Sequence, residues 1–191
     1  MGSFTPNEKE MFNVRITQFG KGLEFGDEVK MAYDSIKKTL KRAKCFSVNE
    51  PVDLFGWSRG AVAALVVAKK LQSDSISIRF LGLIDPVYTG LEDKDYRILF
   101  PSSGPRMAAI PSNVKAGFIA YTPSKKKQLD KVFDVLALQL EDITNKNIHV
   151  KIYKDIGHSA GGFNETIGYD MWEAAKNAGC PLGENPYEKP K

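Results

Sequence analysis

Residues 51–68 read PVDLFGWSRGAVAALVVA and contain the clearest pattern in the chain. A short, mainly apolar segment at residues 52–55 breaks at Gly56, and a continuous apolar run at residues 61–68 follows the break. A short apolar segment that stops at a glycine is typical of a core strand, whereas the longer run, which ends in lysines, is typical of a buried helix. The stretch therefore predicts a strand, a sharp turn and a helix.

Strand and helix patterns alternate along the rest of the chain. Strand patterns occupy residues 76–84, 114–121 and 147–154, and helical patterns occupy residues 27–43, 124–140 and 164–178. In the last strand pattern apolar and polar side chains alternate, which favours a place near the sheet edge. Alternating strands and helices predict the α/β class, here a mostly parallel sheet of about five strands with helices on both faces.

Length and composition fit one ordinary globular unit. The chain has 191 residues, of which 42% are apolar and 26% charged, and this balance supports a core. We expect a single domain over residues 1–191, with frayed ends at about residues 1–10 and 184–191. No apolar run reaches the roughly 18 residues that span a bilayer, and the polar start lacks the layout of a signal peptide. These features predict a soluble chain that is cytoplasmic as synthesised.

The charge clusters and the two cysteines bear on possible partners and on the redox compartment. The formal charge is +4, and basic residues are densest at residues 37–44 and 125–127, without interleaved aromatic residues. Such clusters are typical of solvated helix faces, so we expect no nucleic-acid partner, although transient contact with an anionic membrane surface stays open. Cys45 and Cys180 lack the spacing of a metal site and suit a reduced compartment, with one long-range disulfide as the alternative.

Residues 56–60, GWSRG, match the GxSxG pattern of a nucleophile elbow. In such a turn the two glycines let a strand and a helix approach without a Cβ clash, and the serine is held in strained geometry. We therefore predict Ser58 as a nucleophile, with an ordinary glycine-rich turn as the alternative. The backbone N–H of Arg59, at the helix start, would form half of an oxyanion hole. The glycine-rich stretch that contains Gly20 and Lys21 is the candidate for the second donor.

A serine hydroxyl needs a base that titrates near neutral pH, and the chain has two histidines. His149 lies inside the strand pattern at residues 147–154, where a packing or surface role is more typical. His158 follows that strand in a glycine-containing loop, and α/β folds gather their sites at the carboxyl ends of strands. We predict His158 as the general base, with a loop histidine that has no catalytic role as the alternative.

The third member of such a site is a carboxylate at the end of another strand, between the serine and the histidine in chain order. Asp85 directly follows the strand pattern at residues 76–84 and fits this place. Asp130 falls inside an expected helix, and Asp155 is only three residues from His158, too near to reach around to its ring. The alternative for Asp85 is a turn-forming role in an Asp-Pro strand end.

Several stretches of the chain share a pattern that is found together in one known family. They are residues 20–23 (GKGL), 53–61 (DLFGWSRGA), 80–87 (FLGLIDPV), 114–121 (VKAGFIAY) and 157–159 (GHS). Together they resemble the α/β-hydrolase family that contains the type VI secretion phospholipase effectors. The resemblance implies a reduced α/β-hydrolase-like fold, a triad of Ser58, Asp85 and His158, and a lipid or other ester as substrate. If the chain is an effector, it also implies secretion without a signal peptide.

The chain departs from that family in three ways. The elbow comes early, Trp57 stands where phenylalanine is usual, and there is no large inserted module of the kind that binds membranes in the effectors. The early elbow is the reason to expect a reduced sheet.

These residues predict an esterase-type or lipase-type serine hydrolase. It would form an acyl-enzyme on Ser58 and hydrolyse it with water activated through His158, acting on a small-molecule or lipid ester. This chemistry needs no metal and no organic cofactor. Two alternatives stay open: a thioesterase or acyltransferase would use the same residues, and an inactive hydrolase-like chain would serve as a binding module.

Overall fold

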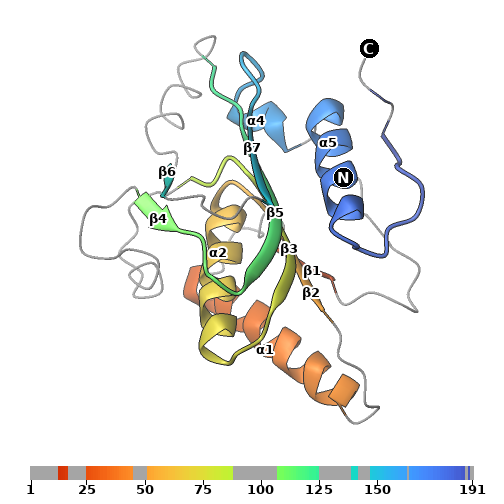
Figure 1. The fold of residues 1–191 in the computed structure, drawn as a ribbon. Coiled ribbons are helices and arrows are strands. Elements are labelled where there is room, and N and C mark those ends of the chain that lie inside the picture. Colours follow the sequence, from red (N-terminus) through yellow and green to blue (C-terminus); the bar gives the residue numbers. More distant parts are fainter. Residues whose placement is uncertain are drawn as a thin grey trace.

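The structure is a computed structural model that describes residues 13–16, 25–44, 51–87, 107–124, 139–141, 147–162, 164–187 and 189. Strands and helices alternate along these ranges (Figure 1). In chain order they are β1 (Asn13–Ile16), α1 (Phe25–Lys44), β2 (Val52–Trp57), α2 (Arg59–Ser73), β3 (Ile78–Ile84), β4 (Met107–Ala109), β5 (Val114–Tyr121), β6 (Gln139–Glu141), β7 (Ile148–Ile152), α4 (His158–Gly161) and α5 (Glu165–Asn177). The predicted strand, turn and helix at residues 51–68 are confirmed as β2, Ser58 and α2.

Five strands form one parallel sheet, in the order β1-β2-β3-β5-β7. β4 and β6 form a separate two-stranded parallel pair. Because the five strands run in the same direction, their carboxyl ends all meet at one edge of the sheet. The predicted α/β class, with a mostly parallel sheet of about five strands, is therefore confirmed.

Helices cover both faces of this sheet, as predicted. Leu81 and Ile119 join one apolar cluster with α1 and α2, whereas Phe80 and Phe118 join a second cluster with α5. α2 packs against the sheet on one side and against α1 on the other. This position explains why its buried residues surround the helix instead of forming one stripe. Figure 1 shows α1 and α2 on one side of the sheet and α5 on the other.

β7 lies at the sheet edge, as its alternating sequence predicts. Ile148 joins the core, but Val150 and Ile152 are 44% and 60% exposed. Apolar side chains at alternate positions therefore indicated the strand and its edge position, although only the first of the three is buried.

The prediction of a helix over residues 124–140 is wrong at its carboxyl-terminal end. Leu140 lies in β6, where it pairs with Ala108 of β4. Residues 125–138, which carry most of the helical pattern, lie outside the described residues. The pairing with β4 gives the backbone of Leu140 a partner that a local pattern could not reveal.

α5 begins and ends as its sequence predicts. The side chain of Asn164 accepts a hydrogen bond from the N–H of Ile167 at 3.1 Å and so caps the helix. Gly179 follows the helix with a φ of +81°, a conformation that favours glycine.

The chain then turns back along α5. The side-chain N–H of Asn185 donates to Glu173 at 2.9 Å. The Tyr187 ring lies against Gly168, where a Cβ would come within 2.4 Å of it. Contacts with α5 thus extend to Tyr187, within the segment for which composition suggested a frayed end.

Cys180 is buried and its thiol is free, so the alternative of a long-range disulfide is not realised. None of the helices in the described ranges is long and apolar enough to cross a membrane.

Candidate active site

Ser58 is the single residue between β2 and α2. Its φ of 57° and ψ of −130° lie in a region that residues with a side chain rarely adopt. Strand and helix are so close here that a Cβ on Gly56 would lie 2.4 Å from the carbonyl oxygen of Gly60. The N–H of Ser58 donates to the carbonyl of Ile84 at 2.9 Å, which holds the turn against the end of β3. The serine is thus fixed at the carboxyl edge of the sheet in a tight, strained turn.

His158 lies next to this serine. Its Nε2 atom is 2.8 Å from the Oγ atom of Ser58. His158 is the first residue of α4 and follows Gly157, whose φ of 86° lets the chain turn there. The histidine is only 5% exposed, so its contact with the serine is shielded from bulk water. The geometry allows a proton to pass from Oγ to Nε2.

Asp85 lies on the other side of the imidazole. It directly follows β3, where its N–H donates to the carbonyl of Ala120 at 2.8 Å and its φ is 41°. Its Oδ2 atom is 3.5 Å from Nδ1 of His158, and both side chains are less than a tenth exposed. The structure therefore brings together the three residues that the sequence singles out, and their roles in catalysis stay a prediction.

Trp57 and Gly162 contact each other beside the histidine. The sequence did not predict this contact. The Trp57 ring stacks on the His158 ring, with centroids 5.8 Å apart and planes 28° apart. Gly162 packs so closely under the indole that a Cβ there would lie 2.5 Å from it. The pair of glycines after His158 is visible in the sequence, but only this contact explains why a side chain does not fit at residue 162.

Thr122 is a further site residue that sequence reasoning missed. It directly follows β5 and is 1% exposed. Its N–H donates to Oδ1 of Asp85 at 2.7 Å, and its hydroxyl donates to Oδ2 of the same carboxylate. The only signal in the sequence is its place after a core strand, at the edge where Asp85 also lies.

The predicted oxyanion-hole residues are only partly within the described structure. Arg59 is the first residue of α2, so its backbone N–H lies at the helix end that stabilises negative charge. Gly20 and Lys21, the candidates for the second donor, lie outside the described residues.

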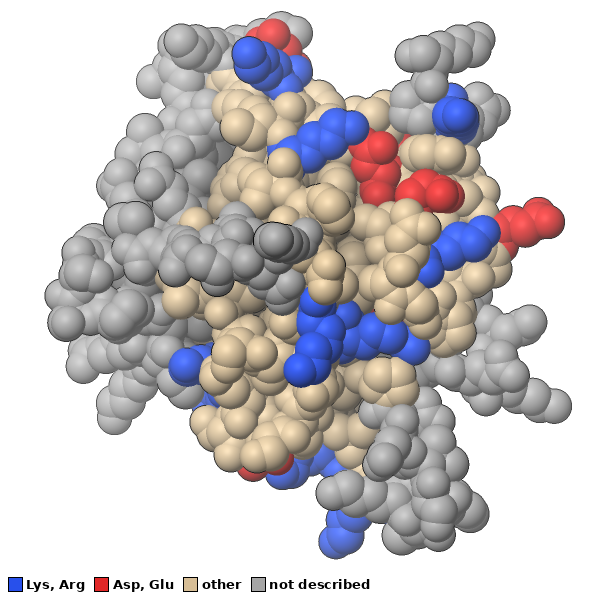
Figure 2. Space-filling view, in the orientation of Figure 1, with Lys and Arg blue, Asp and Glu red and all other residues tan. Residues whose placement is uncertain are grey.

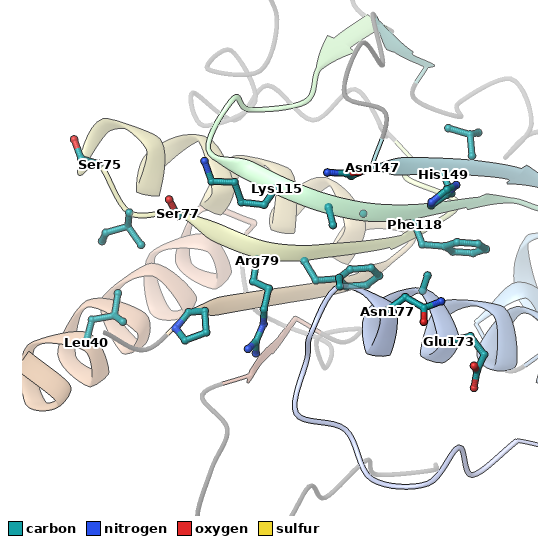
Figure 3. Close-up of a pocket in the computed structure, with 18 of the residues that line it drawn as sticks. Leu40, Ser75, Ser77, Arg79, Lys115, Phe118, Asn147, His149, Glu173 and Asn177 are labelled. Carbon is teal, nitrogen blue, oxygen red and sulfur yellow. The ribbon is translucent and has the colours of Figure 1, made fainter. Parts of the chain in front are cut away.

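Sequence reasoning set aside His149, Asp155 and Asp130 as candidates for this site. His149 is exposed on β7, and it lines a groove at the opposite end of the sheet (Figure 3). Asp155 is exposed in the loop after β7. Asp130 lies outside the described residues.

The groove that His149 lines has a volume of about 1740 Å³ and lies at the amino ends of β3, β5 and β7. Its lining includes Arg79 and Lys115 from the strands and Glu173 from α5, which Figure 3 labels. Arg79 forms an ion pair with the buried Asp53. In Figure 2 basic side chains gather near the centre of the view, with acidic side chains close above them.

One titratable group beside the site has a perturbed pKa. Burial, with the negative charge of Asp85 as a smaller cause, raises the pKa of Tyr121 to about 12. Its phenol is therefore protonated at neutral pH. Among the residues that the structure describes, no three His, Cys, Asp or Glu side chains gather where they could hold a metal ion.

One family model matches part of the chain. A family model described as Thioesterase domain matches residues 6–99, just under half of the chain. The matched range includes Ser58 and Asp85 and ends before His158. A search of curated proteins found no match.

Solved structures with a similar arrangement include a covalent complex of the NocB thioesterase domain with a fluorophosphonate nocardicin G analog. It has a TM-score of 0.45 and 14% identity, and the match covers 83% of this chain and 76% of that one. An uncharacterized protein from Pseudomonas aeruginosa has a TM-score of 0.44 and 19% identity, over 82% of this chain and 28% of that one. The type II thioesterase BorB from the borrelidin biosynthetic cluster has a TM-score of 0.39 and 13% identity, over 82% and 73%.

Proposed function

We propose that this chain is a serine hydrolase that cleaves an acyl thioester through an acyl-enzyme on Ser58. One observation carries the proposal: Oγ of Ser58 lies 2.8 Å from Nε2 of His158, while Oδ2 of Asp85 lies 3.5 Å from Nδ1 on the far side of the ring. A serine hydroxyl becomes an effective nucleophile when a neighbouring base takes its proton. A buried carboxylate then keeps the imidazole in the required tautomer and stabilises its positive charge.

The proposed reaction has two halves. Oγ of Ser58 attacks the acyl carbonyl carbon while Nε2 of His158 takes the hydroxyl proton, and the N–H of Arg59 donates to the developing oxyanion. The tetrahedral intermediate expels the thiol, which leaves with the proton from Nε2, and the acyl group stays on Ser58. Water then attacks the acyl-enzyme with His158 again as base, which releases the acid and restores the serine.

One observation and one chemical argument support the choice of a thioester. The Thioesterase domain model matches the part of the chain that holds Ser58 and Asp85. A thiol with a pKa near 8.5 is also a far better leaving group than an alcohol, so a thioester makes a smaller demand on His158 as general acid. Oxygen esters, including the lipid esters implied by the sequence resemblance, are the alternative substrates for the same residues. The resemblance to type VI secretion phospholipase effectors stays a prediction.

The proposal is tested first with a fluorophosphonate probe, which reacts with activated serines. We expect the wild-type chain to be labelled on the peptide that contains Ser58, and Ser58→Ala to be unlabelled. Absence of labelling in folded wild-type protein would instead favour an inactive hydrolase-like binding module.

A matched pair of substrates tests the leaving group. A short-chain acyl thioester and the oxygen ester of the same acyl group are compared by release of thiol and of acid. We expect a higher kcat/KM for the thioester, and a preference for the oxygen ester would make the chain an esterase. Adding an alcohol or amine acceptor then separates hydrolase from acyltransferase, because only an acyltransferase would pass most of the acyl group to the acceptor.

A further inference from the structure

We infer that Thr122 is the positioning residue that sets the orientation of the Asp85 carboxylate towards His158. The inference rests on the proposed function, because it assigns Thr122 a part in the same reaction. It starts from the observation that one residue supplies a hydrogen bond to each oxygen of Asp85.

The carboxylate of an aspartate does not orient itself. Its terminal torsion joins a tetrahedral to a planar carbon and has a broad, roughly two-fold preference, so partners must fix the plane. Here the N–H of Thr122 holds Oδ1 at 2.7 Å, and the hydroxyl of Thr122 holds Oδ2. Oδ2 is also the oxygen that lies 3.5 Å from Nδ1 of His158. Thr122 thus fixes the plane of the carboxylate relative to the imidazole.

Thr122 also ties the acid to the loop that carries the histidine. Three consecutive carbonyls, beginning at the last residue of β5, accept hydrogen bonds from the chain after β7. The carbonyl of Tyr121 accepts from the N–H of Tyr153 at 2.7 Å. The carbonyl of Thr122 accepts from the N–H of Gly157 at 3.1 Å, and that of Pro123 accepts from the N–H of Asp155 at 2.9 Å. Because Gly157 immediately precedes His158, the backbone of Thr122 holds the histidine loop while its side chain holds the acid.

The packing around Thr122 leaves it little freedom to move. A Cβ on Gly161 of α4 would lie 3.0 Å from both Cγ2 and Oγ1 of Thr122, and 3.2 Å from Oδ2 of Asp85. Figure 1 shows α4 at the end of β7, over this edge of the sheet. Thr122 and Asp85 are both nearly inaccessible, so water cannot readily replace a lost hydroxyl.

The decisive substitution is Thr122→Val, which replaces the hydroxyl by a methyl group of similar size and keeps the backbone N–H. We expect kcat on a p-nitrophenyl ester to fall about 10-fold to 100-fold with KM little changed, because a hydrogen bond to a charged group is lost. Thr122→Ser keeps the hydroxyl and should restore kcat to within a few-fold of wild type. If Thr122→Val fails to fold, Thr122→Ala also removes the hydroxyl and keeps the backbone N–H, with a smaller side chain.

A double-mutant cycle separates positioning from a merely structural role. If Thr122 acts through Asp85, then Thr122→Val should lower kcat no further in an Asp85→Asn background. Equal kcat in Thr122→Val and wild type would overturn the inference, and so would a loss that simply adds to that of Asp85→Asn. Fluorophosphonate labelling of the wild-type chain is the parallel control. Without labelling, the proposed function and the inference both fail, whereas a labelled wild type with a fully active Thr122→Val removes the inference alone.

Discussion

Nε2 of His158 lies 2.8 Å from Oγ of Ser58, although 100 residues separate the two in the chain. The contact exists because β2 and β7 end at the same edge of a parallel sheet. β3 and β5 lie between them, so the chain after β7 must cross the ends of both strands to reach the serine. Asp85 and Thr122 follow β3 and β5 directly, which places them on this path.

Replacing His158 by Gln should lower kcat on a short p-nitrophenyl ester by about 10³ or more, because the members of such a site act as a unit. His149→Gln is the matched control: it changes the chain's other histidine, which is exposed on β7, and should leave activity within a few-fold. Steady-state kinetics on both variants tests this. The reverse order of effects would mean that the base is misassigned.

Asp85→Asn should lower kcat by as much as ~10⁴ with little change in KM, because an amide would hold the imidazole in the wrong tautomer. A role as a turn residue predicts a different result, since Asn can replace Asp there at a stability change of about 1 kcal/mol and without kinetic effect. Melting temperature and kcat are measured on the same sample. Full turnover in this variant would remove Asp85 from the reaction.

Ser58→Ala and Ser58→Gly should both lose turnover and fluorophosphonate labelling, but they should differ in stability. The φ of 57° and ψ of −130° at residue 58 strain any residue with a Cβ, at a cost of about 1–3 kcal/mol, whereas glycine adopts them freely. Glycine also loses more entropy on folding, about 0.5–1 kcal/mol relative to alanine. We therefore expect Ser58→Gly to be the more stable of the two by thermal or denaturant unfolding. A less stable glycine variant would show that the turn stores no strain.

Gly56→Ala should destabilise the chain by about 2 kcal/mol or more and lower activity, because the new Cβ would meet backbone atoms that cannot move independently. It would lie 2.4 Å from the carbonyl oxygen of Gly60 and 2.6 Å from Cα of Ala61. Gly183→Ala is the control, since nothing lies within 4 Å of a Cβ there. Urea unfolding of both variants gives the difference, and equal midpoints would contradict the close approach of β2 and α2.

Cys180 should resist alkylation in the native state. Burial, followed by the negative charge of Asp53, raises the pKa of its thiol to about 12, against roughly 8.5 in an unfolded chain. At pH values between these two the native thiol keeps its proton while the unfolded one loses it, so this group's contribution to stability falls as pH rises from about 8.5 to 12. Labelling with iodoacetamide at pH 8.5 in a Cys45→Ser background checks this. Fast labelling without denaturant would contradict it.

Local chemistry explains what could be read from the sequence. The strand, turn and helix at residues 51–68 follow from an apolar segment, a glycine and a second apolar run, all within one stretch. The Asn164 cap and the Gly179 stop of α5 are likewise set by neighbours in the chain. The places of Ser58, Asp85 and His158 after three parallel strands also follow, because the carboxyl ends of such strands share one edge.

Contacts between distant segments determine the features of the fold and the site that the sequence did not predict. The sequence places Leu140 in a helix, but its pairing with Ala108 makes it part of a strand. Trp57 can be seen beside the serine in the sequence, yet its stacking on His158 depends on how the loop after β7 folds back. Thr122 has no motif, because its role comes from the two hydrogen bonds it donates to Asp85, 37 residues earlier. A pattern in the sequence reports the period and the ends of an element, whereas a contact of this kind exists only after the sheet has brought two strand ends together.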